Sequence, residues 1–125
     1  MKEIRTNKAP EPVGPYSQAV QANNFVFISG QLAINHKTNQ LVQGNIQGQT
    51  LQVFNNIKAT LEEANLTLKN IVKVEIYLKD INDFKEVNKF YTKIFSKPYP
   101  ARHVVEVSNL PLNAKIEIAC IACKD

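Results

Sequence analysis

The sequence lacks a long hydrophobic run, and it has no large excess of charge of either sign. No stretch approaches the roughly 20 apolar residues that a membrane span needs. The first residues, Met1-Lys2-Glu3-Ile4-Arg5, do not form the apolar core of a signal peptide. We therefore expect a cytoplasmic protein with no membrane partner. The formal net charge of +4 is mild, and nucleic-acid binding would require it to gather on one face.

Cysteine and histidine are scarce, with two residues of each. Cys120 and Cys123 form a C-x-x-C motif inside a β-patterned run, where side chains three residues apart point to opposite faces. Three strand steps separate their α-carbons by about 10 Å, too far for a disulfide. A zinc site would need further ligands, and only His36 and His103 are available. We expect two buried or edge thiols and no metal site.

The basic residues gather locally in one place. Lys85, Lys89, Lys93 and Lys97 recur every four residues and would form one row on a helix. The opposite side of that helix would be apolar, with Phe84, Val87, Phe90, Tyr91 and Ile94. We favour a solvated outer face over a nucleic-acid surface, because charged rows are common on surface helices.

A chain of 125 residues, 44% of them hydrophobic, is expected to form one domain over residues 1–125. Two β-prone runs, Tyr16–Ala22 and Phe25–Ser29, flank a turn at Asn23-Asn24, where asparagine tolerates positive φ. Residues 36–48 are polar and predict a loop. The clearest strand is residues 72–79, in which apolar and polar side chains alternate.

Two helices are predicted. The first covers Thr50–Ala64, with Asn65 as its C-terminal cap and an apolar stripe formed by Leu51, Phe54, Ile57, Leu61 and Ala64. The second begins at Asn82 or Asp83 and runs to about Phe95. Pro98 and Pro100 then favour an extended connector. Two final strands follow, at residues 101–107 and 114–123, with a turn around Leu110-Pro111.

This order of elements predicts an α+β fold, a mixed β-sheet with two helices packed on one face. The other face of the sheet would then have no cover within the chain. A β-surface of this size must be buried, so we expect self-association.

Arg102 and Glu117 are the leading candidates for chemistry. Arg102 follows Pro100-Ala101 at the start of a strand, and its permanently charged, planar guanidinium suits a substrate carboxylate. The alternative for Arg102 is an ion pair with Glu106 or Glu117.

Glu117 alternates with Ile116 and Ile118, so it faces away from them and could activate a water molecule. Its alternative is an ion pair with Lys115 or Arg102. Burial would raise the pKa of Glu117, whereas a nearby Arg102 would lower it.

Tyr16 follows Gly14-Pro15, a rigid turn that fixes the start of the strand. Its hydroxyl could donate to a substrate, although a strand-start aromatic packed in the core is equally compatible with the pattern. Ser29 and Gly30 lie at a strand end, where a glycine allows a ligand to approach the backbone or simply permits a turn. No nucleophile with an adjacent base is evident, so covalent catalysis has no support.

Four separated segments occur in the order typical of the Rid (reactive intermediate deaminase, or YjgF) family, which the chain resembles from about its first strand to its C-terminus. The segments are Gly14-Pro15-Tyr16-Ser17-Gln18-Ala19, Ile28-Ser29-Gly30-Gln31, Pro100-Ala101-Arg102 and Ala114-Lys115-Ile116-Glu117-Ile118-Ala119. The resemblance implies a chorismate-mutase-like fold that assembles as a homotrimer, with a site in each intersubunit cleft.

The resemblance also implies cofactor-free hydrolysis of 2-aminoacrylate and 2-imino acids to 2-keto acids and ammonia. These imines escape from pyridoxal-phosphate-dependent dehydratases. Arg102 would hold the substrate carboxylate, Glu117 and Gly30 would orient the water, and Tyr16 would orient the substrate or relay a proton. The positions that would bind the substrate are Arg102, Ser29, Gly30, Gln31, Asn88 and Val104. For Asn88, an ordinary polar residue on a helix surface explains the position equally well.

One position departs from the family pattern. Many members carry a cysteine two residues after the arginine, and this chain has Val104 there. By alternation, Val104 shares a face with Arg102 and serves as a pocket wall, whereas His103 points to the opposite face. Two alternatives to a deaminase remain: a non-catalytic binder of small carboxylates or 2-keto acids, and an endoribonuclease or translation inhibitor.

Overall fold

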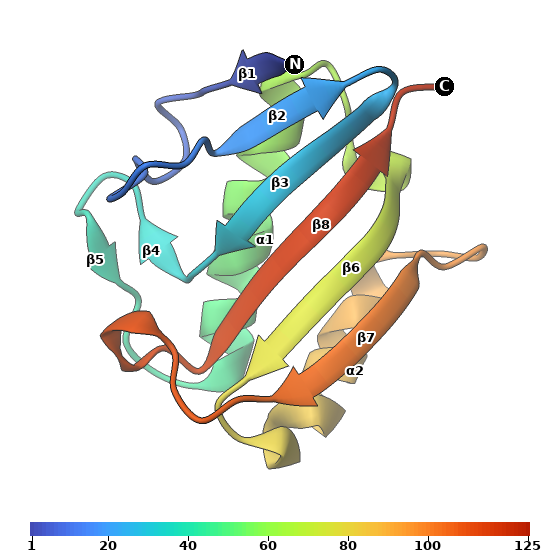
Figure 1. Cartoon of the computed structure of the whole chain (residues 1–125). Helices are drawn as coiled ribbons and strands as arrows, with labels where there is room; N and C mark the ends of the chain where they lie inside the picture. Colours follow the sequence, from blue (N-terminus) through green and yellow to red (C-terminus); the bar gives the residue numbers. More distant parts are fainter.

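The computed structural model describes all residues from Met1 to Asp125. Its main sheet has six strands in the order β1-β2-β3-β8-β6-β7 (Figure 1). The strands are β1 (Lys2–Ile4), β2 (Ala19–Ala22), β3 (Phe25–Gln31), β6 (Ile71–Leu78), β7 (Ala101–Glu106) and β8 (Ile116–Cys123). Only β6 and β7 are parallel, and the other neighbours are antiparallel. A separate small hairpin pairs β4 (Ile34–Asn35) with β5 (Gln40–Leu41).

Two helices, α1 (Ile46–Glu63) and α2 (Phe84–Ile94), lie behind the sheet in the view of Figure 1. Three short 3₁₀ helices complete the chain: η1 (Leu68–Asn70), η2 (Ile81–Asp83) and η3 (Pro111–Asn113). The core lies between α1, α2 and the sheet, where Ile57, Leu61, Ile76 and Ile118 are fully buried. The predicted α+β fold, with both helices on one face of a mixed sheet, is confirmed.

Several local predictions are also confirmed. Asn23 and Asn65 both adopt positive φ, at 53° in the β2–β3 turn and 60° just after α1. Cys120 and Cys123 are free, and they alternate between the buried and the open side of β8. The four lysines of the predicted row are exposed, as expected for a solvated face, although Lys97 lies beyond the end of α2.

Three predictions for local structure were wrong. Helix α1 begins at Ile46, because the side chain of Asn45 accepts a hydrogen bond from the Gly48 amide and caps it. Residues 36–48 therefore contain β5 and the first turn of α1 rather than loop alone. Leu51 lies outside the apolar stripe, with 49% of its surface exposed.

The second helix is preceded by a 3₁₀ turn. The side chain of Asp80 accepts from the Asn82 amide and caps η2, whereas Asp83 makes no side-chain cap to α2. The short edge strand β1 was not predicted, because its three residues carry no alternating pattern of useful length.

The face of the sheet opposite the helices is open. Phe25, Phe27, Val72 and Val105 are exposed there, each with over 40% of its surface accessible. None of the helices is long and apolar enough to span a lipid bilayer.

Candidate active site

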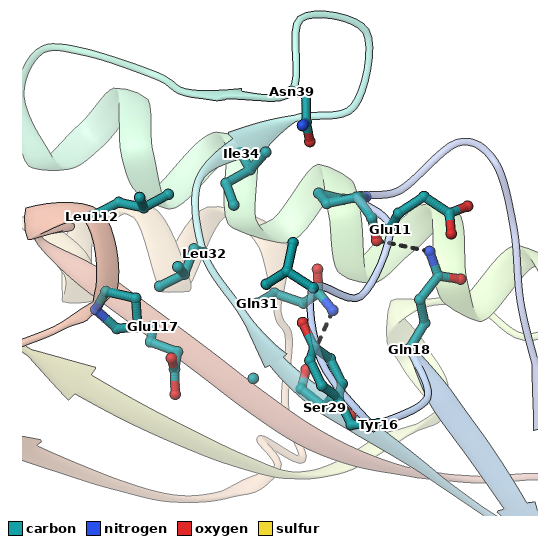
Figure 2. A pocket seen from close by; sticks show the side chains of 14 residues that line it. Glu11, Tyr16, Gln18, Ser29, Gln31, Leu32, Ile34, Asn39, Leu112 and Glu117 are labelled. Atoms are coloured by element: carbon teal, nitrogen blue, oxygen red, sulfur yellow. Dashed lines mark hydrogen bonds between the residues drawn. The ribbon is translucent and has the colours of Figure 1, made fainter.

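A cavity of about 730 Å³ lies beside the end of β3 and the start of β8 (Figure 2). Five residues singled out in the sequence line it: Tyr16, Ser29, Gly30, Gln31 and Glu117. The loop before β2 brings Tyr16, β3 brings the next three, and β8 brings Glu117. The structure thus gathers most of the predicted site in one place.

A bulge in β3 creates the floor of this cavity. Ile28 pairs with Cys120 and Gln31 pairs with Ile118, so Ser29 and Gly30 together face a single residue of β8. Bulges are common beside active sites, because they interrupt the ladder and redirect side chains.

Gly30 leaves room for the Glu117 carboxyl group in its observed position. A Cβ added at Gly30 would lie 2.7 Å from Oε2 of Glu117 and 2.9 Å from its Cδ, closer than real Cβ atoms approach other atoms. The absent side chain therefore lets the Glu117 carboxyl group lie directly over the bulged backbone. This close approach is a more specific reason for glycine than the turn considered from the sequence.

Ser29 anchors the loop that carries Tyr16. Its Oγ donates to the carbonyl of Ser17 at 2.6 Å, and its amide donates to the carbonyl of Gln18 at 3.0 Å. Tyr16 itself is half exposed at the cavity mouth, so the core-aromatic alternative is wrong. Gln31 is buried, and its Nε2 donates to the Ser29 carbonyl at 3.4 Å.

Glu117 makes no ion pair with Lys115 or Arg102; the ion pairs of the chain are Arg5–Glu11, Lys73–Glu75 and Lys89–Glu86. Partial burial raises the pKa of the Glu117 carboxyl above its ordinary value. Burial and a nearby arginine were expected to shift the pKa of Glu117 in opposite directions, and within one chain burial prevails. A carboxylate with a raised pKa is a stronger base than an exposed one.

Arg102 lies on the edge strand β7 and is held by α2. Its Nη1 donates to Oδ1 of Asn88 at 2.8 Å. Its guanidinium carbon lies 4.7 Å from the ring centre of Tyr91 and 5.4 Å from that of Phe84. Arg102 forms no ion pair with Glu106 or Glu117, which was the structural alternative for this residue, because Asn88 and the aromatic rings hold its guanidinium. The remaining guanidinium donors are available to a carboxylate.

Arg102 and Glu117 lie on opposite faces of the sheet. The register partner of Arg102 is Val74, which is buried under the helices, and the Arg102 side chain contacts α2 on that same side. Glu117 sits between the buried Ile116 and Ile118, so it faces the open side. Within a single chain, Arg102 is therefore not placed to lower the pKa of Glu117, and desolvation alone shifts that pKa.

Comparison with known proteins identifies the family of the chain. Residues 6–124 match the model of the family described as Endoribonuclease L-PSP, to which the Rid/YjgF proteins belong. A RutC family protein of Pyrococcus horikoshii is 52% identical over the full length of both chains. A 2-iminobutanoate/2-iminopropanoate deaminase of Dermatophagoides farinae is 44% identical, over 94% of this chain and 92% of its own. The chain belongs to the Rid/YjgF family.

A solved Rid structure extends the likeness to three dimensions. RidA from an Antarctic Psychrobacter species superposes with a TM-score of 0.94 at 43% identity, covering 98% of this chain and 99% of that one. At this similarity the whole Rid fold is shared.

Val104, at the position where many Rid members have a cysteine, is half buried. It pairs with Ile76 and packs against the hydrophobic core beside β6. It shares the helix side of β7 with Arg102, as alternation predicted, but it lines neither the large cavity nor the smaller one beside Arg102. His103 points to the open face, where its ring packs edge-on against Tyr77.

Sequence reasoning missed two parts of the site. Gln18 is buried, and its amide joins the backbone of Thr6 and Pro10 to the cavity wall. Its place in the Gly-Pro-Tyr-Ser-Gln-Ala segment could have indicated this role. The apolar wall formed by Leu32, Ile34 and Leu112 left no such indication, because these residues come from separate loops and strands.

Proposed function

We propose that this protein hydrolyses reactive enamines and imines, namely 2-aminoacrylate and 2-imino acids, to 2-keto acids and ammonia. The observation that carries the proposal is the carboxyl group of Glu117, held partly desolvated over the bulged backbone of Gly30 inside a cavity. The full-length similarity to a protein named as an imine deaminase supports the same reaction.

The first step is addition of water to the imine carbon. Arg102 binds the substrate carboxylate through its free guanidinium donors, while Asn88 keeps the group oriented. An enamine first gains a proton from the solvent at C3, or an imine gains one at nitrogen, and either becomes the iminium ion. Glu117 accepts a proton from the water as its oxygen bonds to C2, which gives a tetrahedral carbinolamine.

The second step releases ammonia. The proton held by Glu117 passes to the substrate nitrogen, with Tyr16 at the cavity mouth able to relay it. The C–N bond then breaks as the C2 oxygen forms a carbonyl and gives its proton to the solvent, which balances the proton taken up at the start. One water is consumed, and one keto acid and one ammonia are formed, so no oxidant or electron acceptor is needed.

The two halves of this site come from different copies of the chain in our proposal. Arg102 is exposed at the sheet edge and Glu117 lies on the open face, so one chain does not present both to one substrate. Association through the open face would bring Arg102 of one copy to the cavity of the next. We propose a homotrimer, acting in the cytoplasm on imines released by pyridoxal-phosphate-dependent dehydratases.

The decisive experiment measures keto-acid release from 2-aminoacrylate, generated in situ by a dehydratase acting on serine. Wild-type protein should accelerate release, and Arg102→Ala should abolish the acceleration. Lys93→Ala is the matched control, since it removes an exposed cation from the same neighbourhood without touching Arg102. Acceleration that survives in Arg102→Ala would disprove the carboxylate anchor. No acceleration by the wild type would disprove the reaction, and saturable keto-acid binding without turnover would then indicate a binder.

Endoribonuclease activity is the second candidate, because the matching family model carries that description and three lysines are exposed along α2. RNA cleavage that falls steeply with salt, and that is lost on removing Lys85, Lys89 and Lys93, would favour it.

A further inference from the structure

The cavity beside Glu117 has a polar part and an apolar part. Leu32, Ile34 and Leu112 form the apolar part, and Figure 2 shows Leu32 and Leu112 on the same side as Glu117, with Tyr16 and Gln18 on the other. A three-carbon imino acid has about six non-hydrogen atoms; at the roughly 30 Å³ that each water occupies in the liquid, it would fill only about a quarter of such a space. The 730 Å³ therefore leaves room for a larger substrate beside the Arg102 side chain that the partner copy would bring.

Leu112 has a backbone conformation that is unfavourable for leucine. Its φ of 58° and ψ of 20° place it in the left-handed region, which is strained for a residue with a Cβ. It is also 64% exposed, so its side chain contributes little to the core.

The loop around Leu112 is held in place despite this strain. The Asn113 amide donates to the Leu110 carbonyl and the Ala114 amide donates to that of Pro111, at 3.2 and 3.1 Å. Lys79 Nζ donates to the Asn113 side chain. A strained and exposed apolar residue that the surrounding contacts hold on a cavity wall is a candidate for a functional role.

We propose that Leu112, together with Leu32 and Ile34, binds the apolar side chain of the substrate and gives the protein a preference for 2-imino acids with bulky apolar side chains. This inference rests on the proposed function, because it assigns the substrate of the same cavity. Glu117 and these three residues line the same cavity, so a substrate whose reacting carbon lies beside Glu117 can direct its side chain to this wall. Contact with it removes apolar surface from water on both partners.

The test compares two imines, generated in situ from leucine and from alanine by an amino-acid oxidase, with the remaining imine trapped as its semicarbazone. Wild-type kcat/KM should be higher for the leucine-derived imine. Leu112→Asn should lower the ratio of the two values by about tenfold, the size of effect that a few apolar contacts give. Asparagine tolerates the left-handed backbone, so this variant does not strain the loop further. Leu51→Ala is the control, because Leu51 is an exposed leucine on α1 that does not line the cavity, and it should leave both values unchanged.

A binding measurement separates this inference from the proposed reaction. The affinities of 4-methyl-2-oxopentanoate and pyruvate should differ in the same direction, and Leu112→Asn should reduce that difference by a similar factor whether or not the protein turns over imines. Equal affinities in the wild type, or a difference that Leu112→Asn leaves intact, would overturn the apolar subsite. Absence of turnover with selective binding would overturn only the deaminase reaction.

Discussion

At the scale of single residues, Gly30 is the position where the smallest change should have a large effect. A methyl group at Gly30 would meet the Glu117 carboxyl at 2.7 Å, so the carboxyl must move. We expect Gly30→Ala to lower kcat/KM for 2-aminoacrylate by about 100-fold, because a displacement of about 1 Å at a reacting group costs this much.

Gly48→Ala is the matched control for this substitution. The added Cβ would lie 3.5 Å from Oδ1 of Asn45, an ordinary contact, and Gly48 is inside helix α1. It should keep full activity and raise the free energy of unfolding by about 0.5–1 kcal/mol. If Gly30→Ala keeps the kcat/KM of the wild type, the position of the Glu117 carboxyl group is unimportant for the reaction.

The raised pKa of Glu117 predicts the pH dependence of the reaction. As a base, Glu117 must be ionised, so kcat/KM should fall as the pH is lowered through its pKa. Since desolvation raises that pKa above its ordinary value of 4.5, the acid limb should lie above pH 4.5. Glu117→Gln should remove both the limb and most of the activity.

The resistance of Glu117→Gln to unfolding by urea shows whether this variant is folded. Burial disfavours the ionised form, so above pH 4.5 the carboxylate of Glu117 opposes folding, and neutral glutamine does not. Glu117→Gln should therefore unfold at a higher urea concentration than the wild type at pH 7, and this difference should vanish below pH 4.5. An acid limb at or below pH 4.5 would mean that a neighbouring positive charge outweighs desolvation.

At the scale of secondary-structure elements, local chemistry predicted most strands and turns. The alternation of apolar and polar residues predicted strand β6, and the asparagines at positions 23 and 65 predicted two turns. Both predictions succeeded because they depend only on neighbouring residues. The start of α1 was missed because Ile46-Gln47-Gly48-Gln49 mixes a glycine with glutamines and hides the apolar period. The cap that decides it, Asn45, was present but resembled the loop before it.

Helix α2 illustrates what sequence patterns leave out. Phe84, Asn88 and Tyr91 are spaced to share one face, and all three contact Arg102 of β7. The apolar period of this helix predicts a core face, and Val87 and Tyr91 are buried as expected. Part of the same face also holds the Arg102 guanidinium. This contact depends on the parallel pairing of β7 with β6, which places β7 beside α2 and which the helix sequence does not indicate.

The site itself could be predicted only in part, for the same reason. Alternation correctly placed Glu117 opposite Ile116 and Ile118, because it is a local property. Whether Arg102 shares a face with Glu117 depends on two strand registers, and the bulge at Ser29-Gly30 depends on a third. Register is set by tertiary packing, so the separation of these groups on opposite faces became evident only in the structure.

At the scale of the whole molecule, that separation makes the active site a property of the assembly. In our proposal, Arg102 of one copy acts with Glu117 of another, so variants defective in different halves should complement each other. Arg102→Ala and Glu117→Gln should each be inactive alone. After denaturation and refolding as an equal mixture, about a quarter of the sites should combine an intact arginine with an intact glutamate, because each half is intact in one copy of two.

The recovered activity should therefore approach about a quarter of that of refolded wild-type protein at the same total concentration. The control mixture contains Arg102→Ala and the double variant Arg102→Ala/Glu117→Gln, so no copy has an intact Arg102. This mixture should recover no activity. Refolded mixtures should sediment as the wild type does, which establishes that assembly occurred. Mixed assemblies of wild-type size without activity would mean that no site combines these residues from two copies, and the proposed intersubunit mechanism would have to be abandoned.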